Sequence, residues 1–379
     1  MQMVDDRAAT RDLLLLSRVP GIGPARLRAL VDHFGSARAV TQALPRDLVS
    51  VQGIEQKTAL AVTAFFRQGA PADAREFVDD QLRRMQKGEV LFTTPWDSDY
   101  PSHLRKIYDP PPFLFLRGTL LTRDAAAVAI VGTRTPSAYG SRIADRFAAD
   151  MAGRGITVVS GLARGIDTVA HTAALRAGGR TIAVIGSGLD VLYPPENRSL
   201  AARIEGHGAV LSEFPMGTKP DAMNFPQRNR IVSGLSLGTL VIETGTEGGA
   251  MITARTALDQ NREVFAIPAP VDAAKRSGAN RLLREGQALL TETVEDILNE
   301  LRPHLDGLIP DLPAPPQQEL PPLTLFEQRV ADVISNEPVH IDWITERSAL
   351  TPAETLVHLL SLECKGLVRQ LPGKHFVRI

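Results

Sequence analysis

The spacing of apolar positions divides the chain into three regions. Between Asp12 and about Arg84, apolar residues recur every three or four positions, which is the spacing of amphipathic helices. Glycine and proline interrupt this pattern at Pro20–Pro24 and again at Gly53, as they do between short helices. We therefore expect a small helical domain over residues 1–90.

The central region alternates short apolar runs with amphipathic stretches. Strands without a polar face, separated by helices, are typical of a parallel sheet that helices cover on both sides. The pattern predicts an extended Rossmann-type domain with a doubly wound, mainly parallel sheet over residues 91–305. Its strands are expected at Val128–Val131, Ile156–Ser160, Thr181–Ile185, Val210–Ser212, Thr239–Ile242 and Val264–Ile267.

Proline enrichment separates the last region from the rest of the chain. Residues 306–322 contain many prolines and few large apolar side chains, so we expect a semi-rigid linker there. Residues 323–379 then show three helical segments followed by two short apolar runs joined across Pro372-Gly373. The third helix is expected to begin with Thr351 as its N-cap and Pro352 in its first turn. This order of elements predicts a winged-helix-like domain.

Composition narrows the classes of protein. The 379 residues include one cysteine, Cys364, which excludes an internal disulfide framework and a multi-cysteine zinc site. The segment from Met1 to Arg18 is too charged for a signal peptide or a membrane span, so we expect a cytoplasmic protein without a membrane partner. Because the net charge is only -1, any nucleic-acid site has to be a local patch.

Two small-residue turns follow successive predicted strands. The first is Gly132-Thr133-Arg134, and the second runs from Ser160 to Asp167 through Gly161, Arg164 and Gly165. Such strand-to-helix turns present backbone N–H groups where the helix dipole favours an anion, and both are expected at the carboxyl edge of the sheet. Neither turn matches the dinucleotide fingerprint or the Walker A pattern, so we expect no nucleotide cofactor.

The segment Asn224–Arg230 has the side chains that a single strand of DNA requires. Arg228 and Arg230 supply charge-assisted donors to phosphate, Asn224 and Asn229 supply amides for base edges, and Phe225 offers a stacking face. The alternative is a solvated loop around a buried Phe225.

Three further features leave alternatives open. Asp167 and His171 lie four residues apart, which permits a general base or a metal ligand, but an aspartate near a helix start is more often a capping group. The turn containing Gly248 and Gly249 either presents amides to phosphate or only caps the next helix. Glu243, at a strand end, keeps an enzymatic role open.

The first helical region contains a possible second DNA contact. Val19–Leu27 resembles the hairpin of a helix-hairpin-helix motif, whose backbone amides approach a phosphate, with Arg26 or Arg28 adding charge. A second copy near Gly53 has Glu55 where the first has Gly23, which favours packing over phosphate binding there.

Five motifs follow one another through the central region. They are Val131–Arg134, Ser160–Asp167 with Ala170-His171, Gly188–Pro194 with Asn197, Ser212–Pro215 and Phe225–Arg230. In order and spacing these motifs resemble the DprA/Smf family, and the flanking domains also resemble the accessory domains of long family members.

The resemblance implies a non-enzymatic mediator with no catalytic residue, metal or cofactor. It implies a Rossmann domain that forms a homodimer, binds and protects incoming single-stranded DNA, and loads a RecA-type recombinase during natural transformation. Two departures from the family pattern, Gly248–Met251 and Ala269, weaken the expected contacts at their loops. The residues expected to contact DNA are Gly132, Thr133, Arg134, Ser160, Gly161, Arg164, Gly165, Asp167, Asn224, Phe225, Arg228, Asn229, Arg230, Gly248 and Gly249.

Two rival functions come from other classes. The first is a nucleotide-processing enzyme resembling phosphoribohydrolases, with Glu243 or Glu247 acting on a ribosyl bond, although their Pro-Gly-Gly-x-Gly-Thr loop is absent here. The second is a transcription regulator that reads duplex DNA through the winged helix. The few basic residues of that region disfavour the regulator and suit a protein partner instead.

Overall fold

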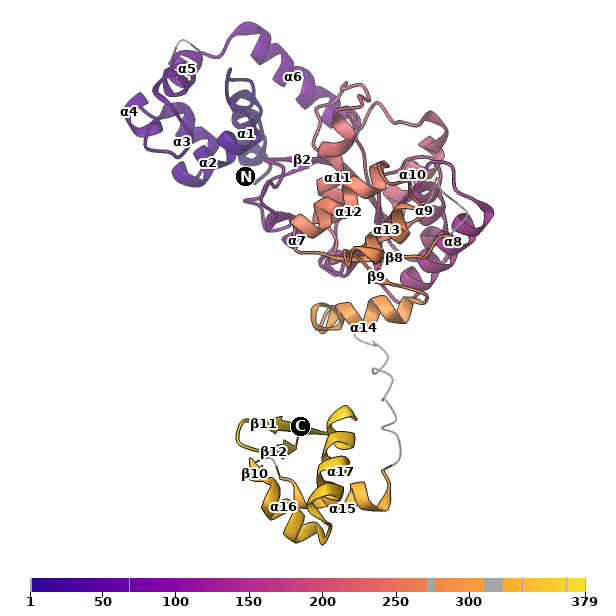
Figure 1. Cartoon of the computed structure of the whole chain (residues 1–379). Helices are drawn as coiled ribbons and strands as arrows, with labels where there is room; N and C mark the ends of the chain where they lie inside the picture. The colour runs from indigo at the N-terminus through magenta and orange to yellow at the C-terminus, as the bar shows by residue number, and fades with distance from the viewer. Residues whose placement is uncertain are drawn as a thin grey trace. The chain divides into compact units, whose positions relative to one another are not determined.

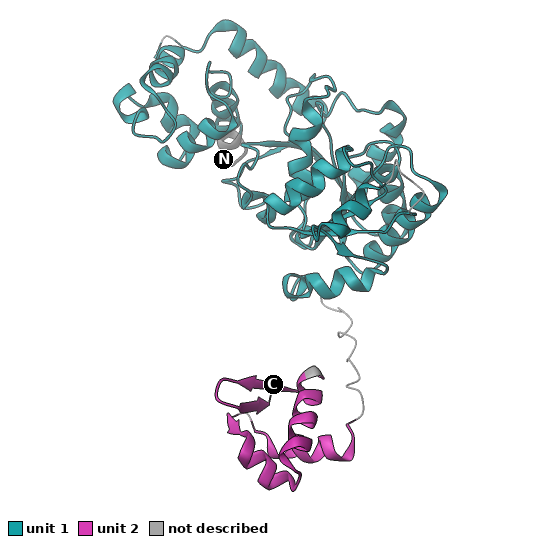
Figure 2. Cartoon of the chain, in the orientation of Figure 1, with its two compact units in different colours: residues 1–312 teal, residues 313–379 magenta. Residues whose placement is uncertain are grey.

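The computed structural model describes residues 2–67, 69–270, 277–309, 323–335, 337–365 and 367–378. The chain divides into two compact units, residues 1–312 and 313–379 (Figure 2). The linker predicted over 306–322 falls largely on residues 310–322, which lie outside the described residues. None of the helices within the described ranges is long and apolar enough to cross a membrane.

The first unit begins with helices, as the apolar spacing predicts. Leucines such as Leu14, Leu16 and Leu30 are fully buried between them. The side-chain amide of Gln81 exchanges two hydrogen bonds with the backbone of Met216, at 2.7 and 3.2 Å, which fixes the last of these helices against the central domain. The helices are α1 (Gln2–Leu16), α2 (Pro24–Phe34), α3 (Ala37–Gln42), α4 (Pro45–Leu48), α5 (Gln56–Arg67) and α6 (Ala72–Lys87).

A nine-stranded sheet forms the centre of the first unit (Figure 1). Its order is β1-β2-β6-β5-β4-β3-β7-β8-β9, with β3 to β9 parallel and β1 and β2 antiparallel. The predicted doubly wound, mainly parallel sheet is therefore confirmed. The strands are β1 (Leu91–Thr93), β2 (Leu114–Gly118), β3 (Ala127–Gly132), β4 (Thr157–Ser160), β5 (Thr181–Val184), β6 (Gly208–Ser212), β7 (Gly238–Ile242), β8 (Glu263–Ala266) and β9 (Leu289–Leu290).

Helices cover both faces of this sheet. Successive strand residues point to opposite faces, so Val128 and Ile130 pack into one core while Ala129 and Val131 pack into the other. The first face is covered by α8 (Ala138–Gly153), α9 (Ile166–Arg176), α10 (Arg198–His207) and α14 (Val294–Leu305), and the second by α7 (Ser102–Arg105), α11 (Asn224–Gly234), α12 (Gly249–Asp259) and α13 (Gly278–Arg284).

A buried ion pair lies at the amino ends of the parallel strands. Arg180, just before β5, donates to both carboxylate oxygens of Asp124 at 2.7 Å, and the two side chains are 13% and 7% exposed. Asp124 lies in the 3-10 turn η1 (Thr122–Ala125) and also accepts from the hydroxyl of Thr157 at 2.8 Å. The pair thus ties the starts of β4 and β5 to the segment that leads into β3.

The second unit has the predicted winged-helix order. Its three strands form a sheet in the order β10-β12-β11, and Thr351 caps the third helix by accepting from Glu354 N. Glu327 is buried, and hydrogen bonds from Lys365 and Ser361 lower its pKa to about 2. The elements are α15 (Leu325–Val333), β10 (Val339–His340), α16 (Ile341–Ser348), α17 (Pro352–Cys364), β11 (Val368–Leu371) and β12 (His375–Arg378).

The buried pair makes a direct stability prediction. Arg180→Met leaves the Asp124 carboxylate buried without its counter-charge, so we expect the free energy of unfolding to fall by about 3 kcal/mol. Arg176→Met is the matched control, because Arg176 pairs with Asp145 on the surface, where the side chains are 58% and 41% exposed. Removing that pair should cost less than about 1 kcal/mol. Urea unfolding of both variants checks the difference, and equal losses would contradict it.

Candidate nucleic-acid interface

The turns after β3, β4 and β7 meet at the carboxyl edge of the sheet. β3 and β7 are neighbours, and the chain leaves them toward opposite sides of the sheet, which is where open α/β sheets form a crevice. A pocket of about 330 Å³ lies there. Its wall consists of Val131, Gly132, Thr133, Arg134, Gly161, Ala163, Asp167, Phe225, Arg228, Asn229, Val232, Thr244, Gly245, Gly248, Gly249, Ala250 and Thr253.

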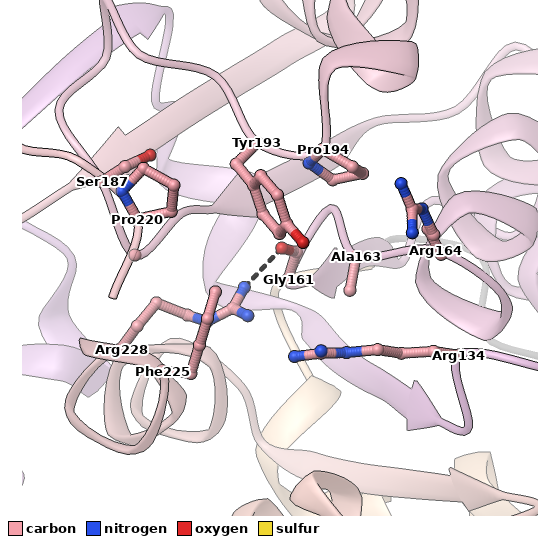
Figure 3. A pocket seen from close by; sticks show the side chains of 11 residues that line it. Arg134, Gly161, Ala163, Arg164, Ser187, Tyr193, Pro194, Pro220, Phe225 and Arg228 are labelled. Atoms are coloured by element: carbon pink, nitrogen blue, oxygen red, sulfur yellow. Dashed lines mark hydrogen bonds between the residues drawn. The ribbon is translucent and has the colours of Figure 1, made fainter. Parts of the chain in front are cut away.

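A smaller hollow of about 40 Å³ continues this pocket (Figure 3). The two share five residues, so we treat them as one site and call it the carboxyl-edge pocket. The shared residues are Arg134, Gly161, Ala163, Phe225 and Arg228, and the smaller hollow adds Arg164, Gly186, Ser187, Tyr193, Pro194 and Pro220.

Arg134 supplies an accessible positive charge in this pocket. Its side chain is exposed and makes no ion pair with any residue that the structure describes. The guanidinium carbon lies 5.3 Å from the ring centroid of Phe225, within cation–π range. Figure 3 shows the Arg134 side chain extending along the pocket toward Phe225. A cation and an aromatic face are therefore presented side by side.

Arg228 is held quite differently. It is only 5% exposed, and its Nη1 donates to the carbonyl oxygens of Gly161 and Val184. Burial lowers its pKa to about 10, against the opposing effect of the Asp167 carboxylate. The sequence assigned Arg228 to a bound phosphate. Nη1 is committed to the backbone, while the side chain still lines the pocket, so the contact with phosphate stays a prediction.

The carboxylate of Asp167 accepts hydrogen bonds from two of the backbone amides that were expected to face a ligand. Its carboxylate accepts from Gly161 N at 3.1 Å and from Ala163 N at 3.2 Å. Burial raises the pKa of this carboxyl group, while Arg228 and the two amides act to lower it. Asp167 therefore binds the turn that precedes it while it also lines the pocket, and its expected contact with DNA stays a prediction.

His171 has no catalytic environment. It is fully buried, its Nδ1 lies 2.6 Å from the hydroxyl oxygen of Thr181, and burial lowers its pKa to about 3. The imidazole is therefore neutral at physiological pH. Within the described ranges, no three His, Cys, Asp or Glu side chains gather in a way that could hold a metal ion.

Four other predicted residues lie outside the pocket wall. The Ser160 hydroxyl donates to Ile130 O at 2.6 Å, and the Asn224 amide donates to Gly186 O at 3.1 Å. Gly165, with φ +79°, lies so close to the first turn that a Cβ would come within 2.4 Å of Thr133 O.

Arg230, the last of these four residues, is engaged in two ion pairs. It forms ion pairs with Glu213 at 2.5 Å and with Asp109 at 3.1 Å, and its side chain is 13% exposed. Both arginines belong to α11, but their side chains contact different neighbours. Arg228 reaches the β4–α9 turn, whereas Arg230 reaches the carboxylates of Glu213 and Asp109. The contacts of Arg230 are those of a structural ion pair, and its expected contact with DNA stays a prediction.

Tyr193 is a pocket residue that the sequence reasoning did not single out. The residue is 40% exposed, and its ring lies 6.3 Å from that of Phe225, centroid to centroid. It belongs to the Gly188–Pro194 motif, so the signal was present, but nothing in the motif indicates which side chain faces the pocket.

Glu243 is engaged in capping a helix. It is 2% exposed, accepts from Ser137 N at 2.8 Å and also accepts from the Ser137 hydroxyl. Ser137 is the N-cap of α8, so the carboxylate stabilises the start of that helix.

The arginines of the predicted N-terminal hairpin are also used internally. Arg28 Nη1 donates to Pro110 O at 2.6 Å, and Arg26 Nη1 donates to Gly21 O at 2.8 Å. These hydrogen bonds support the local fold of this region, and the expected contact of the hairpin with DNA stays a prediction.

Comparisons with known proteins agree with this architecture. Residues 91–302 match the family model described as DNA recombination-mediator protein A. The chain is 36% identical to Protein Smf of Synechocystis, over 96% of this chain and 98% of that protein. It is also 43% identical to Protein Smf of Escherichia coli, over 74% and 75% of the two chains. The chain belongs to the DprA/Smf family.

The flanking domains match models of their own. Residues 13–68 match a SAM-like helix-hairpin-helix tandem, and residues 314–374 match the DprA winged helix domain. Both predicted fold types are therefore confirmed.

Two solved structures of the family are similar to the chain. Streptococcus pneumoniae DprA superposes with a TM-score of 0.65 at 33% identity, covering 77% of this chain and 97% of that one. Helicobacter pylori DprA, described as having a unique single-stranded DNA binding mode, superposes with a TM-score of 0.50 at 30% identity, covering 56% of this chain and 96% of that one.

The tight contact between Gly161 and Arg228 can be tested by substitution. A Cβ on Gly161 would lie 2.0 Å from Arg228 Nη1, so Gly161→Ala has to displace the guanidinium and should destabilise the chain by about 1–3 kcal/mol. Gly249→Ala is the control on the opposite wall, because a Cβ there meets no atom within 4 Å. We expect that change to stay within about 0.5 kcal/mol of the parent. Chemical denaturation measures both, and a neutral Gly161→Ala would contradict the account.

Proposed function

We propose that the chain binds single-stranded DNA in the carboxyl-edge pocket. The observation that carries the proposal is the accessible guanidinium of Arg134 beside the ring of Phe225, in a crevice bounded by glycine turns. Arginine is suited to phosphate, and an aromatic ring is suited to an unstacked base. Family membership supports the same ligand, because the Helicobacter pylori relative is described as binding single-stranded DNA.

The pocket suggests how a strand is held. A phosphate lies against Arg134 and the start of α12, where Gly248 and Gly249 leave room for close approach and the helix dipole favours an anion. A neighbouring base stacks on Phe225, and Tyr193 extends the aromatic surface. Because every base has a face that can stack, sequence preference should be weak and affinity should fall with salt.

Beyond binding, we infer that the chain transfers the bound strand to a recombinase. The resemblance supports a homodimer through the Rossmann domain that protects incoming DNA in the cytoplasm and loads a RecA-type recombinase during natural transformation. We infer that the chain does this without catalysing a reaction. The contacts of Glu243 support that inference, since its carboxylate caps α8, while Glu247 is exposed outside the pocket wall.

The mediator proposal and the enzymatic alternative predict different results with nucleoside monophosphates. If the chain is a mediator, it should release no free base from them above a protein-free blank, as chromatography of the mixture measures. Sustained release that Glu243→Gln abolishes, without unfolding the chain, would contradict the mediator proposal.

Arg134 gives the sharpest test of DNA binding. In Arg134→Ala, affinity for a labelled oligothymidine should fall about tenfold to a hundredfold, because a charge-assisted phosphate contact is lost. The slope of log affinity against log salt should become shallower by about 0.7. Thermal stability should not change, since the side chain is exposed and has no ion-pair partner within the described part of the chain.

Arg203→Ala is the matched control for Arg134→Ala. Arg203 is an exposed arginine on α10 that does not contribute to the pocket wall, and it should leave both affinity and slope unchanged. Equal effects of the two substitutions would place the DNA contact outside the pocket.

Phe225 tests the stacking contact separately. Phe225→Ala should weaken binding of the oligothymidine by about 1–3 kcal/mol. The slope of log affinity against log salt should not change, because stacking involves no counterion release. Fluorescence anisotropy across a salt series measures both quantities. A variant that changes the slope but not the affinity at low salt would contradict a stacking role.

A further inference from the structure

A carboxylate holds one of the arginines that line the carboxyl-edge pocket. Arg164 Nε donates to Glu196 Oε1, and the two side chains remain 59% and 50% exposed. Glu196 lies in the 3-10 turn η2 (Pro195–Asn197), directly after Tyr193 and Pro194 of the pocket wall. A negative charge therefore lies at the rim of a site whose proposed ligand is also negative.

The position of Glu196 is fixed by its neighbour in the chain. Asn197 is 5% exposed, and its amide donates to Leu162 O and to the hydroxyl of Thr168, both at 2.9 Å. Leu162 belongs to the turn that also contains Arg164. The buried amide thus joins η2 to this turn, so the carboxylate and the guanidinium are held within reach of each other by the fold.

The three arginines of the pocket are held in three ways. Arg134 has no ion-pair partner within the described ranges, Arg228 is fixed to backbone carbonyls, and Arg164 is paired with an exposed carboxylate. An ion pair between exposed side chains is weak and exchanges readily in water. Guanidinium groups also bind phosphate in a bidentate manner. Of the three, Arg164 is the one whose partner a phosphate can replace.

We propose that Glu196 acts as a brake on DNA binding. Glu196 is paired with Arg164 while the pocket is empty. A phosphate of the bound strand replaces Glu196 as the partner of Arg164, and the ion pair forms again when the strand dissociates. The charge of Glu196 also repels the phosphates next to the one that Arg164 contacts. The inference rests on the proposed function and adds to it a means of release, which a protein that passes its strand to a partner requires.

The test compares Glu196→Gln with the parent chain. The substitution keeps the shape of the side chain and removes its charge, so affinity for an oligothymidine at about 0.1 M salt should rise about threefold to tenfold. The dissociation rate, measured by stopped-flow competition with unlabelled strand, should fall by a similar factor. Glu196→Ala should change both quantities in the same direction.

Asp145→Asn is the matched control. Asp145 pairs with Arg176 at the far end of α9, with side chains 41% and 58% exposed, and neither residue lines the pocket. That variant should bind as the parent does. In an Arg164→Ala background, the gain from Glu196→Gln should shrink, because there is no longer a guanidinium to release.

The outcomes separate this inference from the function on which it rests. A parent chain that binds no oligonucleotide would overturn both. A parent that binds, together with a Glu196→Gln variant that binds equally well or more weakly, would overturn the brake alone. A gain of the same size in Asp145→Asn would show a general effect of charge, and would also overturn it.

Discussion

The arrangement of the pocket depends on the buried guanidinium of Arg228. It reaches from α11 to two backbone carbonyls, one in the β4–α9 turn and one at the end of β5, while the carboxylate of Asp167 binds the amides of the same turn. Removing either charged group leaves the other buried without its opposite charge, which is costly in a protein interior. The turn is thereby held rigidly at the edge of the sheet, and this positions the remaining groups of the pocket.

This rigidity separates the groups that build the pocket from those that can bind. Asp167 and Arg228 each form hydrogen bonds with the backbone of the pocket, and their opposite charges attract. Arg134, in contrast, extends into the pocket with its charge unpaired among the described residues. A turn that is already held in place needs no rearrangement when a ligand binds, which lowers the entropic cost of association. The pocket also presents few groups that could distinguish one base from another, which agrees with the weak sequence preference proposed above.

Much of the fold follows from the order of residues. The apolar runs located six central strands, and the Thr351-Pro352 pair located the start of α17, because periodicity and capping are local properties. The edge strands β1 and β9 were missed because runs of three and two residues leave little periodic signal.

The site was predictable only in part, for a physical reason. A glycine turn and its arginines identify a region that can bind phosphate. The sequence does not say, however, which of these donors form hydrogen bonds within the protein itself. Arg134, Arg228 and Arg230 are indistinguishable as letters, yet one is exposed, one binds carbonyls and one is paired with Glu213. Those differences arise from long-range contacts such as that between α11 and the β4–α9 turn.

Photocrosslinking tests the central claim most directly. A single-stranded oligonucleotide containing 5-iododeoxyuridine crosslinks to aromatic side chains that stack on its bases, and mass spectrometry identifies the peptide. We predict crosslinks at Phe225 and Tyr193, which line one pocket. Crosslinks confined to residues 13–68 or to the winged helix, with none in the central domain, would contradict the account and move the DNA site to a flanking domain.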